Sequence, residues 1–329
     1  MQELLEIYHP ELPDFLGPFL AVSEMQRLKY VGMNCGCEYT NFPLFRDIGH
    51  YSRKQHSTGT ALIVWHFTGS KHETLAALFH DIATPVFAHV VDFLRGDYLT
   101  QEATESGTGD IIRGSCEIMR MLNTLQIDVS HVENYHHYPI ADNESPRLSA
   151  DRLEYTFGNL LNYGFLPLKD LKKIYEKLCV SVTEDGRQEL VFLDAETAET
   201  FGKAALRCSR VYVSDEDRYA MQMLAELLRD AIAGGVLTDE DLSATEPEVI
   251  QKLTADPRFR ARWGQYCALN VMCDPNGKSA AQRRVIPAKK RYIDPYVMGK
   301  GRLSQISRTF YEEMEDFLAE SFDREICGE

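Results

Sequence analysis

Residues 73–81 read ETLAALFHD, an apolar run that ends in a histidine and an aspartate. Leu75, Leu78 and Phe79 fall at positions i, i+3 and i+4, which predicts a helix with one buried face. The dipeptide His80-Asp81 follows directly on this face. Carrying an imidazole and a carboxylate into such surroundings costs several kcal/mol unless something pairs with them. The stretch therefore predicts a buried helix whose polar end has a dedicated partner.

Helical periodicity dominates the rest of the chain. Apolar residues recur at helical spacing over residues 60–67, 110–125, 149–161 and 217–232. One segment, residues 178–193, instead has two β-rich runs around Asp185-Gly186. Asp-Gly between such runs predicts a hairpin with a type I′ turn, because that turn needs positive φ at both central positions. We expect an all-α, mainly helical protein with one small β-hairpin.

The length of 329 residues suggests about two domains, on a usual size of roughly 150 residues each. A soft boundary falls near residue 165, after the helix expected to start at Ser149. We expect a core at residues 1–165, and a C-terminal helical lobe at 166–329 that packs on it and includes the hairpin.

Composition excludes several classes of protein. The chain is 44% hydrophobic and 26% charged, as in soluble globular proteins, and its 50 acidic against 35 basic residues give a net charge of −15. This charge disfavours a nucleic acid polymer as partner. No apolar run is long enough for a membrane span, and the N-terminus lacks the features of a signal peptide. With eight scattered cysteines and no CxxC pair, we expect reduced thiols and a cytoplasmic location.

Two histidines and two aspartates on predicted helices stand out as metal ligands: His56, His80, Asp81 and Asp151. Two imidazoles and two carboxylates form a mixed nitrogen and oxygen site that suits one divalent transition metal, Fe, Mn, Ni, Co or Zn. Four protein ligands on an octahedral ion leave two positions, for water and a phosphate oxygen.

The order of these residues resembles the HD-domain superfamily of metal-dependent phosphohydrolases, whose signature is H…HD…D on a helical core. Within it, the sequence is most similar to the deoxynucleoside-triphosphate triphosphohydrolase branch. The matching stretches run in the family's order over about residues 22–160: QRLKY at 26–30, YSRKQHS at 51–57, LAALFHDI at 75–82, then Pro85, Phe87 and His89, and SADRLEY at 149–155.

The resemblance implies roles for these residues. The four metal ligands would hold the ion, which lowers the pKa of a bound water and polarises a phosphoryl oxygen. Arg53 would reach a substrate phosphate or the site's carboxylates, His89 would face the phosphates, and Tyr155 would contact a sugar. The resemblance implies a small phosphorylated substrate, with a nucleotide as the expected one, and a homo-oligomer, which the family often forms.

This chain departs from that branch at some positions. It has Thr84 and Gln101 where the family carries histidines, and Asn159 where the family carries an arginine. We expect Thr84 and Gln101 to contact the substrate, and Glu102 to handle protons. The departures leave a second hypothesis open, a nucleotide-binding regulator with weakened catalysis. A third is a scaffold without metal.

Two further clusters have alternative interpretations. His131, His136 and His137 precede Asp151, and with it they could serve a second metal ion about 3.5–4 Å from the first; alternatively they belong to a polar loop that lines the substrate pocket. The basic run of residues 282–291 is either a solvated surface or a source of phosphate-binding charge. Its charged members are Arg283, Arg284, Lys289, Lys290 and Arg291.

Overall fold

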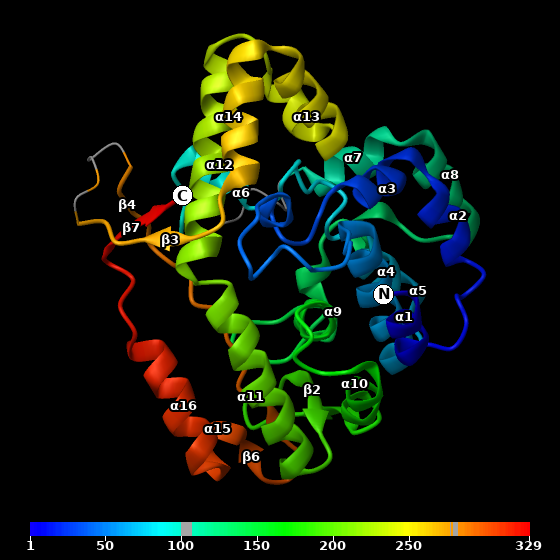
Figure 1. The fold of residues 1–329 in the computed structure, drawn as a ribbon. Helices are drawn as coiled ribbons and strands as arrows, with labels where there is room; N and C mark the ends of the chain where they lie inside the picture. Colours follow the sequence, from blue (N-terminus) through cyan, green and yellow to red (C-terminus); the bar gives the residue numbers. More distant parts are fainter. Residues whose placement is uncertain (100–106, 277, 279–281) are drawn as a thin grey trace.

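The computed structural model describes residues 1–99, 107–276, 278 and 282–329, and it is mainly helical (Figure 1). In the N-terminal half the helices are α1 (Gln2–Tyr8), α2 (Leu16–Ala21), α3 (Ser23–Arg27), α4 (Arg53–Thr68), α5 (Lys71–Phe79), α6 (Val90–Arg95), α7 (Thr108–Gly114), α8 (Cys116–Leu125) and α9 (Ala150–Asn162). Further on they are α10 (Leu168–Tyr175), α11 (Ala195–Val211), α12 (Asp215–Ala233), α13 (Glu246–Ala255), α14 (Pro257–Ala268), α15 (Leu303–Ile306) and α16 (Arg308–Ala319).

Short strands form two small sheets. The strands are β1 (Leu178–Val182), β2 (Gln188–Phe192), β3 (Met272–Cys273), β4 (Arg284–Val285), β5 (Tyr296–Val297), β6 (Gly301–Arg302) and β7 (Glu325–Gly328). One sheet has the order β1-β2-β5-β6 and the other β3-β7-β4. The mainly helical class with minor β structure is therefore confirmed.

The predicted hairpin is present, but its turn differs from the prediction. β1 and β2 pair antiparallel from Leu178 opposite Phe192 to Val182 opposite Gln188. The connection is a five-residue loop, 183–187, in which only Gly186 has positive φ, of 79°. The side chain of Thr183 bonds Asp185 and the backbone of Arg187, and these local bonds stabilise the wider loop.

The helices that carry the predicted ligands are defined by strong local signals. Ser52 and Gln55 form a reciprocal capping box at the start of α4. Gly69, at φ 63°, ends α4, and the Ser70 hydroxyl accepts a hydrogen bond from Glu73 at the start of α5. This two-residue connection folds α5 back onto α4, and α9 packs against α4 as well. The predicted helix over 110–125 is instead two helices, since Ser115 caps α8 directly after α7 ends.

Buried apolar residues fall into two clusters. The first unites α1, α4, α5 and α9 with α11 and α16, and the second unites α6 with α12, α13 and α14. Tyr163 and Tyr212 pack against both clusters. Each cluster contains residues from both sides of position 165, and the division into 1–165 and 166–329 stays a prediction. Across the described residues, no helix combines the length and apolarity that crossing a bilayer would require.

Candidate metal centre and its pocket

His56, His80, Asp81 and Asp151 come together from three helices. His56 lies in the first turns of α4, His80 ends α5 and Asp151 lies in the first turn of α9, whose N-terminus is capped by Ser149. The two histidines and Asp81 are almost fully buried, and Asp151 is half-buried. The three helices thus direct four polar side chains into one interior point.

The donor atoms are spaced as ligands of one ion would be. His56 Nε2 lies 3.1 Å from His80 Nε2 and 3.0 Å from Asp151 Oδ1. Asp81 Oδ2 lies 3.8 Å from His56 Nε2 and 3.6 Å from His80 Nε2. Neighbouring ligands about 2.1 Å from one ion are roughly 3–3.5 Å apart. The set therefore fits a divalent metal, and the described residues contain one such histidine and carboxylate cluster, built on His56, His80 and Asp151.

Electrostatics at the site favour a positive charge. Burial disfavours a charged imidazole, but hydrogen bonds to Asp151 and Glu154 outweigh it and raise the pKa of His56 to about 10. Burial likewise opposes ionisation of Asp81, but Arg53 and the two histidines hold the pKa of that carboxyl well below its usual range. A field that retains a proton on His56 equally favours a metal cation among the same oxygens.

The ligands are oriented by partners behind them. His56 Nδ1 lies 2.6 Å from Glu154 Oε2, which also accepts from the Tyr51 hydroxyl. His80 Nδ1 bonds the Ala77 carbonyl at 2.7 Å. These contacts leave both Nε2 atoms facing Asp151. The sequence reading missed Glu154, although its position three residues after Asp151 puts both carboxylates on one face of α9.

Asp81 is held by two neighbours. Arg53 Nη1 donates to Asp81 Oδ2 at 3.0 Å, and the Thr84 hydroxyl donates to Oδ1 at 2.7 Å. Thr84 is fully buried and lies behind Asp81, outside the pocket lining. In this structure Thr84 is therefore not positioned to make the contact with substrate that the sequence predicts. Its hydroxyl is occupied by the carboxylate three residues earlier.

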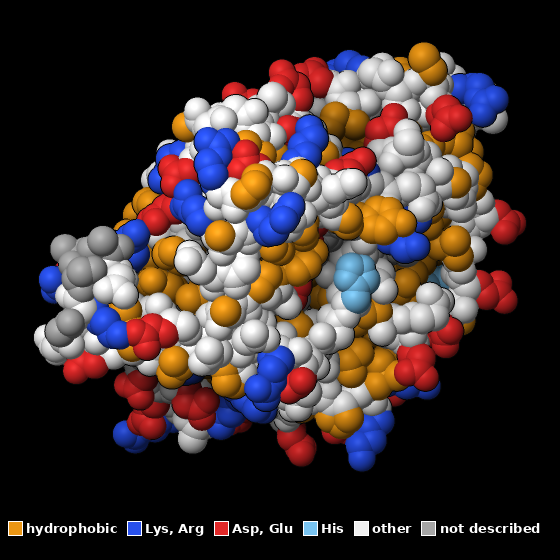
Figure 2. Space-filling view, turned by 45° about the horizontal axis from the view of Figure 1, so that its top comes forward, with side chains coloured by type: hydrophobic (Ala, Val, Ile, Leu, Met, Phe, Trp, Pro, Cys, Tyr) orange, Lys and Arg blue, Asp and Glu red, His pale blue; other side chains and the backbone are white. Residues whose placement is uncertain are grey.

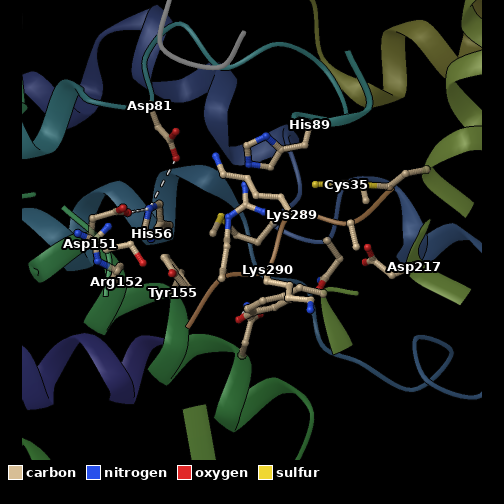
Figure 3. A pocket seen from close by; sticks show the side chains of 18 of the residues that line it. Cys35, His56, Asp81, His89, Asp151, Arg152, Tyr155, Asp217, Lys289 and Lys290 are labelled. Carbon is tan, nitrogen blue, oxygen red and sulfur yellow. Dashed lines mark hydrogen bonds and ion pairs between the residues drawn. The ribbon is translucent and has the colours of Figure 1, made fainter. Parts of the chain in front are cut away.

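The metal ligands form one wall of a cavity of about 340 Å³. Arg53, His89 and Tyr155 also line it, and their contact with a substrate stays a prediction. An extended segment, residues 287–292, also lines the cavity, and we call it the strap. Figure 3 shows His56 and Asp151 at one side, Asp217 and Cys35 at the other, and Lys289 and Lys290 between. Figure 2 shows one face of the molecule, on which basic, acidic and hydrophobic side chains are interspersed.

The strap adds Lys289, Lys290 and Arg291 to a lining that otherwise has four aspartates and three arginines. Lys290 Nζ donates to the Glu320 carbonyl at 2.6 Å and to that of Leu318, which ties the strap to the end of α16. Burial dominates the pKa shifts of His89, Tyr155 and Asp217, and the charge of Arg291 adds a smaller lowering influence on each. The Arg291 charge thus influences three residues that line the cavity.

His89 is held as a neutral imidazole. Burial lowers its pKa to about 4, partly opposed by a 2.9 Å bond from Nδ1 to Asp92 Oδ2. This bond directs the other ring nitrogen away from Asp92, and the residue lines the cavity.

The three histidines before Asp151 do not gather around it. The His131 ring lies 5.7 Å from that of His72, and His137 contacts Asn134. His136 bonds Asp142 at 2.7 Å. All three are exposed and outside the cavity lining, so the described residues offer no second metal cluster there. The three histidines belong to 3-10 turns and are exposed, whereas Tyr135 and Asp142 of the same loop line the cavity.

Gln101 and Glu102 lie outside the described residues. Asn159 lines the cavity, and its amide donates to the Tyr212 hydroxyl at 2.7 Å. The sequence reading also missed Cys35, Asp217 and Tyr212 as cavity residues. No local signal marks them, because only the tertiary fold brings these segments to α9.

Comparison with known proteins gives remote likenesses. No family model matches the chain. It is 27% identical over 210 residues to "Uncharacterized protein YdhJ" of Bacillus subtilis, covering 62% of this chain and 61% of that protein. It is 26% identical over 207 residues to "Metal-dependent phosphohydrolase cns2" of Cordyceps militaris, covering 60% and 56%. The matches thus span less than two thirds of these relatives' lengths.

The fold has a solved counterpart. The crystal structure of a hypothetical protein from Aquifex aeolicus matches with a TM-score of 0.63 over 96% of this chain and 92% of that one, at 15% identity. That likeness concerns the fold alone. The chain is therefore similar in sequence to a protein named as a metal-dependent phosphohydrolase, and similar in fold to the Aquifex protein.

Proposed function

We propose that this chain is an HD-type metal-dependent phosphohydrolase that hydrolyses a nucleotide or another small phosphate ester. One observation carries the proposal: the donor atoms of His56, His80, Asp81 and Asp151 lie 3.0–3.8 Å apart across the measured pairs, and these residues line a cavity that basic side chains also line. The order H…HD…D and the likeness to a protein named metal-dependent phosphohydrolase support it.

His56, His80, Asp81 and Asp151 would hold the ion. When bound, a divalent ion supplies a water of lowered pKa and polarises the phosphoryl oxygen that it touches. Among the described residues, Arg53 is hydrogen-bonded only through Nη1, to Asp81, and its Nε is buried, so Nη2 remains for a phosphoryl oxygen. His89 can hydrogen-bond the phosphate from the other side. The Arg53 guanidinium would offset negative charge that develops on the phosphoryl oxygens, and the neutral His89 would add a hydrogen bond.

The cavity suits a small phosphorylated molecule. About 340 Å³ is within the usual range for small-molecule sites, roughly 300–1,000 Å³. Tyr155, Tyr163 and Tyr212 line it and offer ring faces and hydroxyls to a sugar or base. The strap supplies positive charge that the acidic chain as a whole lacks. A nucleoside phosphate combines the groups that these surfaces would bind.

The test is turnover by the purified chain loaded with Mn²⁺, Fe²⁺, Co²⁺, Ni²⁺ or Zn²⁺. Substrates are p-nitrophenyl phosphate and a panel of nucleotides. We expect phosphate release that is lost in His80→Ala and Asp81→Ala. His72→Ala is the matched control, because His72 is an exposed histidine on the same helix α5. An absence of turnover on every ester with metal bound would overturn the proposal.

A regulatory role is the second candidate, favoured by the Thr84 hydroxyl being occupied by Asp81. It predicts that nucleotides raise the melting temperature without being consumed. Turnover of about 1 s⁻¹ or faster, an ordinary enzymatic rate, would exclude the regulatory role and support the hydrolase.

A further inference from the structure

Two cysteines face each other in the small sheet near the C-terminus. β3 and β7 run antiparallel, and their register places Cys273 opposite Cys327. Burial raises the pKa of Cys327 to about 11, and a hydrogen bond between the two thiols adds to this rise. Opposed residues of an antiparallel pair have Cα atoms about 4.5–5.5 Å apart. This spacing lies within the range of about 4.4–6.8 Å found in disulfides.

The backbone hydrogen bonds between β3 and β7 indicate how far apart the two cysteines are. Val271 and Glu329 exchange both backbone hydrogen bonds, at 3.1 and 2.9 Å. Cys273 and Cys327, two positions along, therefore also occupy a hydrogen-bonded site, where side chains are farther apart than at the alternate sites. Their Cα atoms are therefore expected about 5.5 Å apart, at the spacing that is most common in disulfides.

The C-terminal strand also holds the strap. β7 pairs on its other edge with β4, Arg284 opposite Ile326 and Val285 opposite Glu325. The strap begins two residues after β4 and lines the cavity. Figure 1 shows β3, β4 and β7 together at one side of the molecule, joined to α16 by a single extended segment. A covalent link across β3 and β7 would thus fix the strand on which β4 is aligned.

We propose that Cys273 and Cys327 are a redox modification site, forming a reversible disulfide that fastens the C-terminal strand to the sheet beside the strap. The oxidant is a small disulfide of the glutathione class. The Cys273 thiolate attacks one sulfur of that disulfide and releases one thiol. Cys327 then loses its proton and attacks the Cys273 sulfur of the mixed disulfide, which releases the second thiol. Two protein thiols are oxidised and one disulfide is reduced to two thiols.

The surroundings favour this order of steps. Cys273 is half-buried, whereas Cys327 is fully buried and reachable through its neighbour. The positive charge of Lys278 interacts with both thiols and partly opposes the burial that raises the pKa of Cys327. The exposed Cys116 is an internal comparison, because it lies on α8, away from this sheet.

The experiment incubates the full chain with oxidised glutathione, alkylates the remaining thiols under denaturing conditions and maps peptides by mass spectrometry. We expect a peptide linked through Cys273 and Cys327, restored to two alkylated cysteines by dithiothreitol. Cys116 should carry single glutathione adducts. The linked peptide should be absent in Cys273→Ser. Since Cys327 is buried and its replacement can destabilise the chain, Cys327→Ala is the second variant.

A functional readout follows from the strand's role. Limited proteolysis of the tail after α16 should slow several-fold on oxidation in the wild type, and should not change in Cys273→Ser. The proposal is overturned if Cys273 and Cys327 stay alkylatable while Cys116 is glutathionylated. It is equally overturned if each carries glutathione without a link. None of these readouts depends on phosphohydrolase activity.

Discussion

Glu154 shows how one buried carboxylate sets the state of a neighbouring ligand. It is fully buried, and its Oε2 accepts from His56 and from Tyr51. A proton held on His56 Nδ1 leaves Nε2 as the lone-pair donor toward the centre. Such partners behind a ligand commonly contribute a factor of about 10–100 to metal affinity.

We therefore expect Glu154→Gln to weaken metal binding by about 10–100-fold while the protein stays folded. The measurement is competition with a chromophoric chelator. Glu196→Gln, an exposed glutamate on α11, is the control and should bind as the wild type does. Unchanged affinity in Glu154→Gln would mean that Glu154 serves packing alone.

Asp217 gives the pocket a response to pH. Burial raises the pKa of this carboxyl to about 7, opposed by Arg291, the Cys37 thiol and Arg218. Below that pH it is neutral; above it, a negative charge faces an anionic substrate. The Michaelis constant should therefore rise as pH increases, by about 3- to 10-fold between about pH 6 and pH 8.

Asp217→Asn isolates this effect from the titration of the substrate phosphate, whose own pKa is about 6. The variant should lack the rise, and the ratio of the two Michaelis constants on one substrate should change with pH. A ratio that is constant across this range would show that Asp217 does not face the bound substrate.

For single residues, the part of the site that could be predicted is the part that local sequence patterns mark. Each of His56, His80, Asp81 and Asp151 stands out because it is a polar group on an apolar helix, and the structure does bring them together. The strap could be noticed only as a basic run. Its position depends on the bond from Lys290 to the end of α16, a contact between distant segments that spacing does not encode.

Among the elements, the approach of α4 and α9 sets the distance from His56 to Asp151. Gly59 lies against Glu154, where an added Cβ would be 2.5 Å from a carboxylate oxygen. Gly158 lies against Tyr51 in the same way, with 2.4 Å to its ring. Both glycines let the helices approach closely enough for the side-chain bonds across the interface.

Gly59→Ala should destabilise the fold by about 1–3 kcal/mol, since the added methyl must displace buried groups. The check is the urea midpoint. Gly264→Ala on α14 is the matched control: nothing lies within 4 Å of its added Cβ, so the better helix propensity of alanine should stabilise by about 0.5–1 kcal/mol. Equal midpoints for the two variants would contradict this account of the interface.

The elements also show where sequence patterns stop being informative. Periodicity predicted α5, α9 and α12 to within two residues at each end, whereas the predicted run of residues 60–67 covers only the second half of α4. The two-residue strands β5 and β6 had no such signal. Arg302 of β6 donates to both carboxylate oxygens of the fully buried Glu189 of β2, at 2.7 and 2.6 Å. This ion pair joins residues more than a hundred positions apart and stabilises the small sheet that contains β5 and β6.

For the whole molecule, the main feature is that the cavity lies where the two apolar clusters meet. The Tyr163 hydroxyl donates to Asn34 at 3.0 Å, and the Tyr266 hydroxyl donates to the Gly36 carbonyl at 2.8 Å. These bonds hold the segment around Cys35 against both clusters. Since the metal ligands belong to one cluster and Asp217 to a helix of the other, substrate would contact both.

Metal removal should consequently lower the stability of the molecule. An ion held by α4, α5 and α9 binds the folded chain only, so at 100 times its dissociation constant it adds about 2.7 kcal/mol. For a chain of this size that corresponds to roughly 5 °C in melting temperature. Chelation should lower the wild-type midpoint by about this amount, and re-addition of the metal should restore it. His72→Ala should respond like the wild type, whereas His80→Ala should start lower and not respond. An equal shift in His80→Ala would place the stabilising ion somewhere other than this centre.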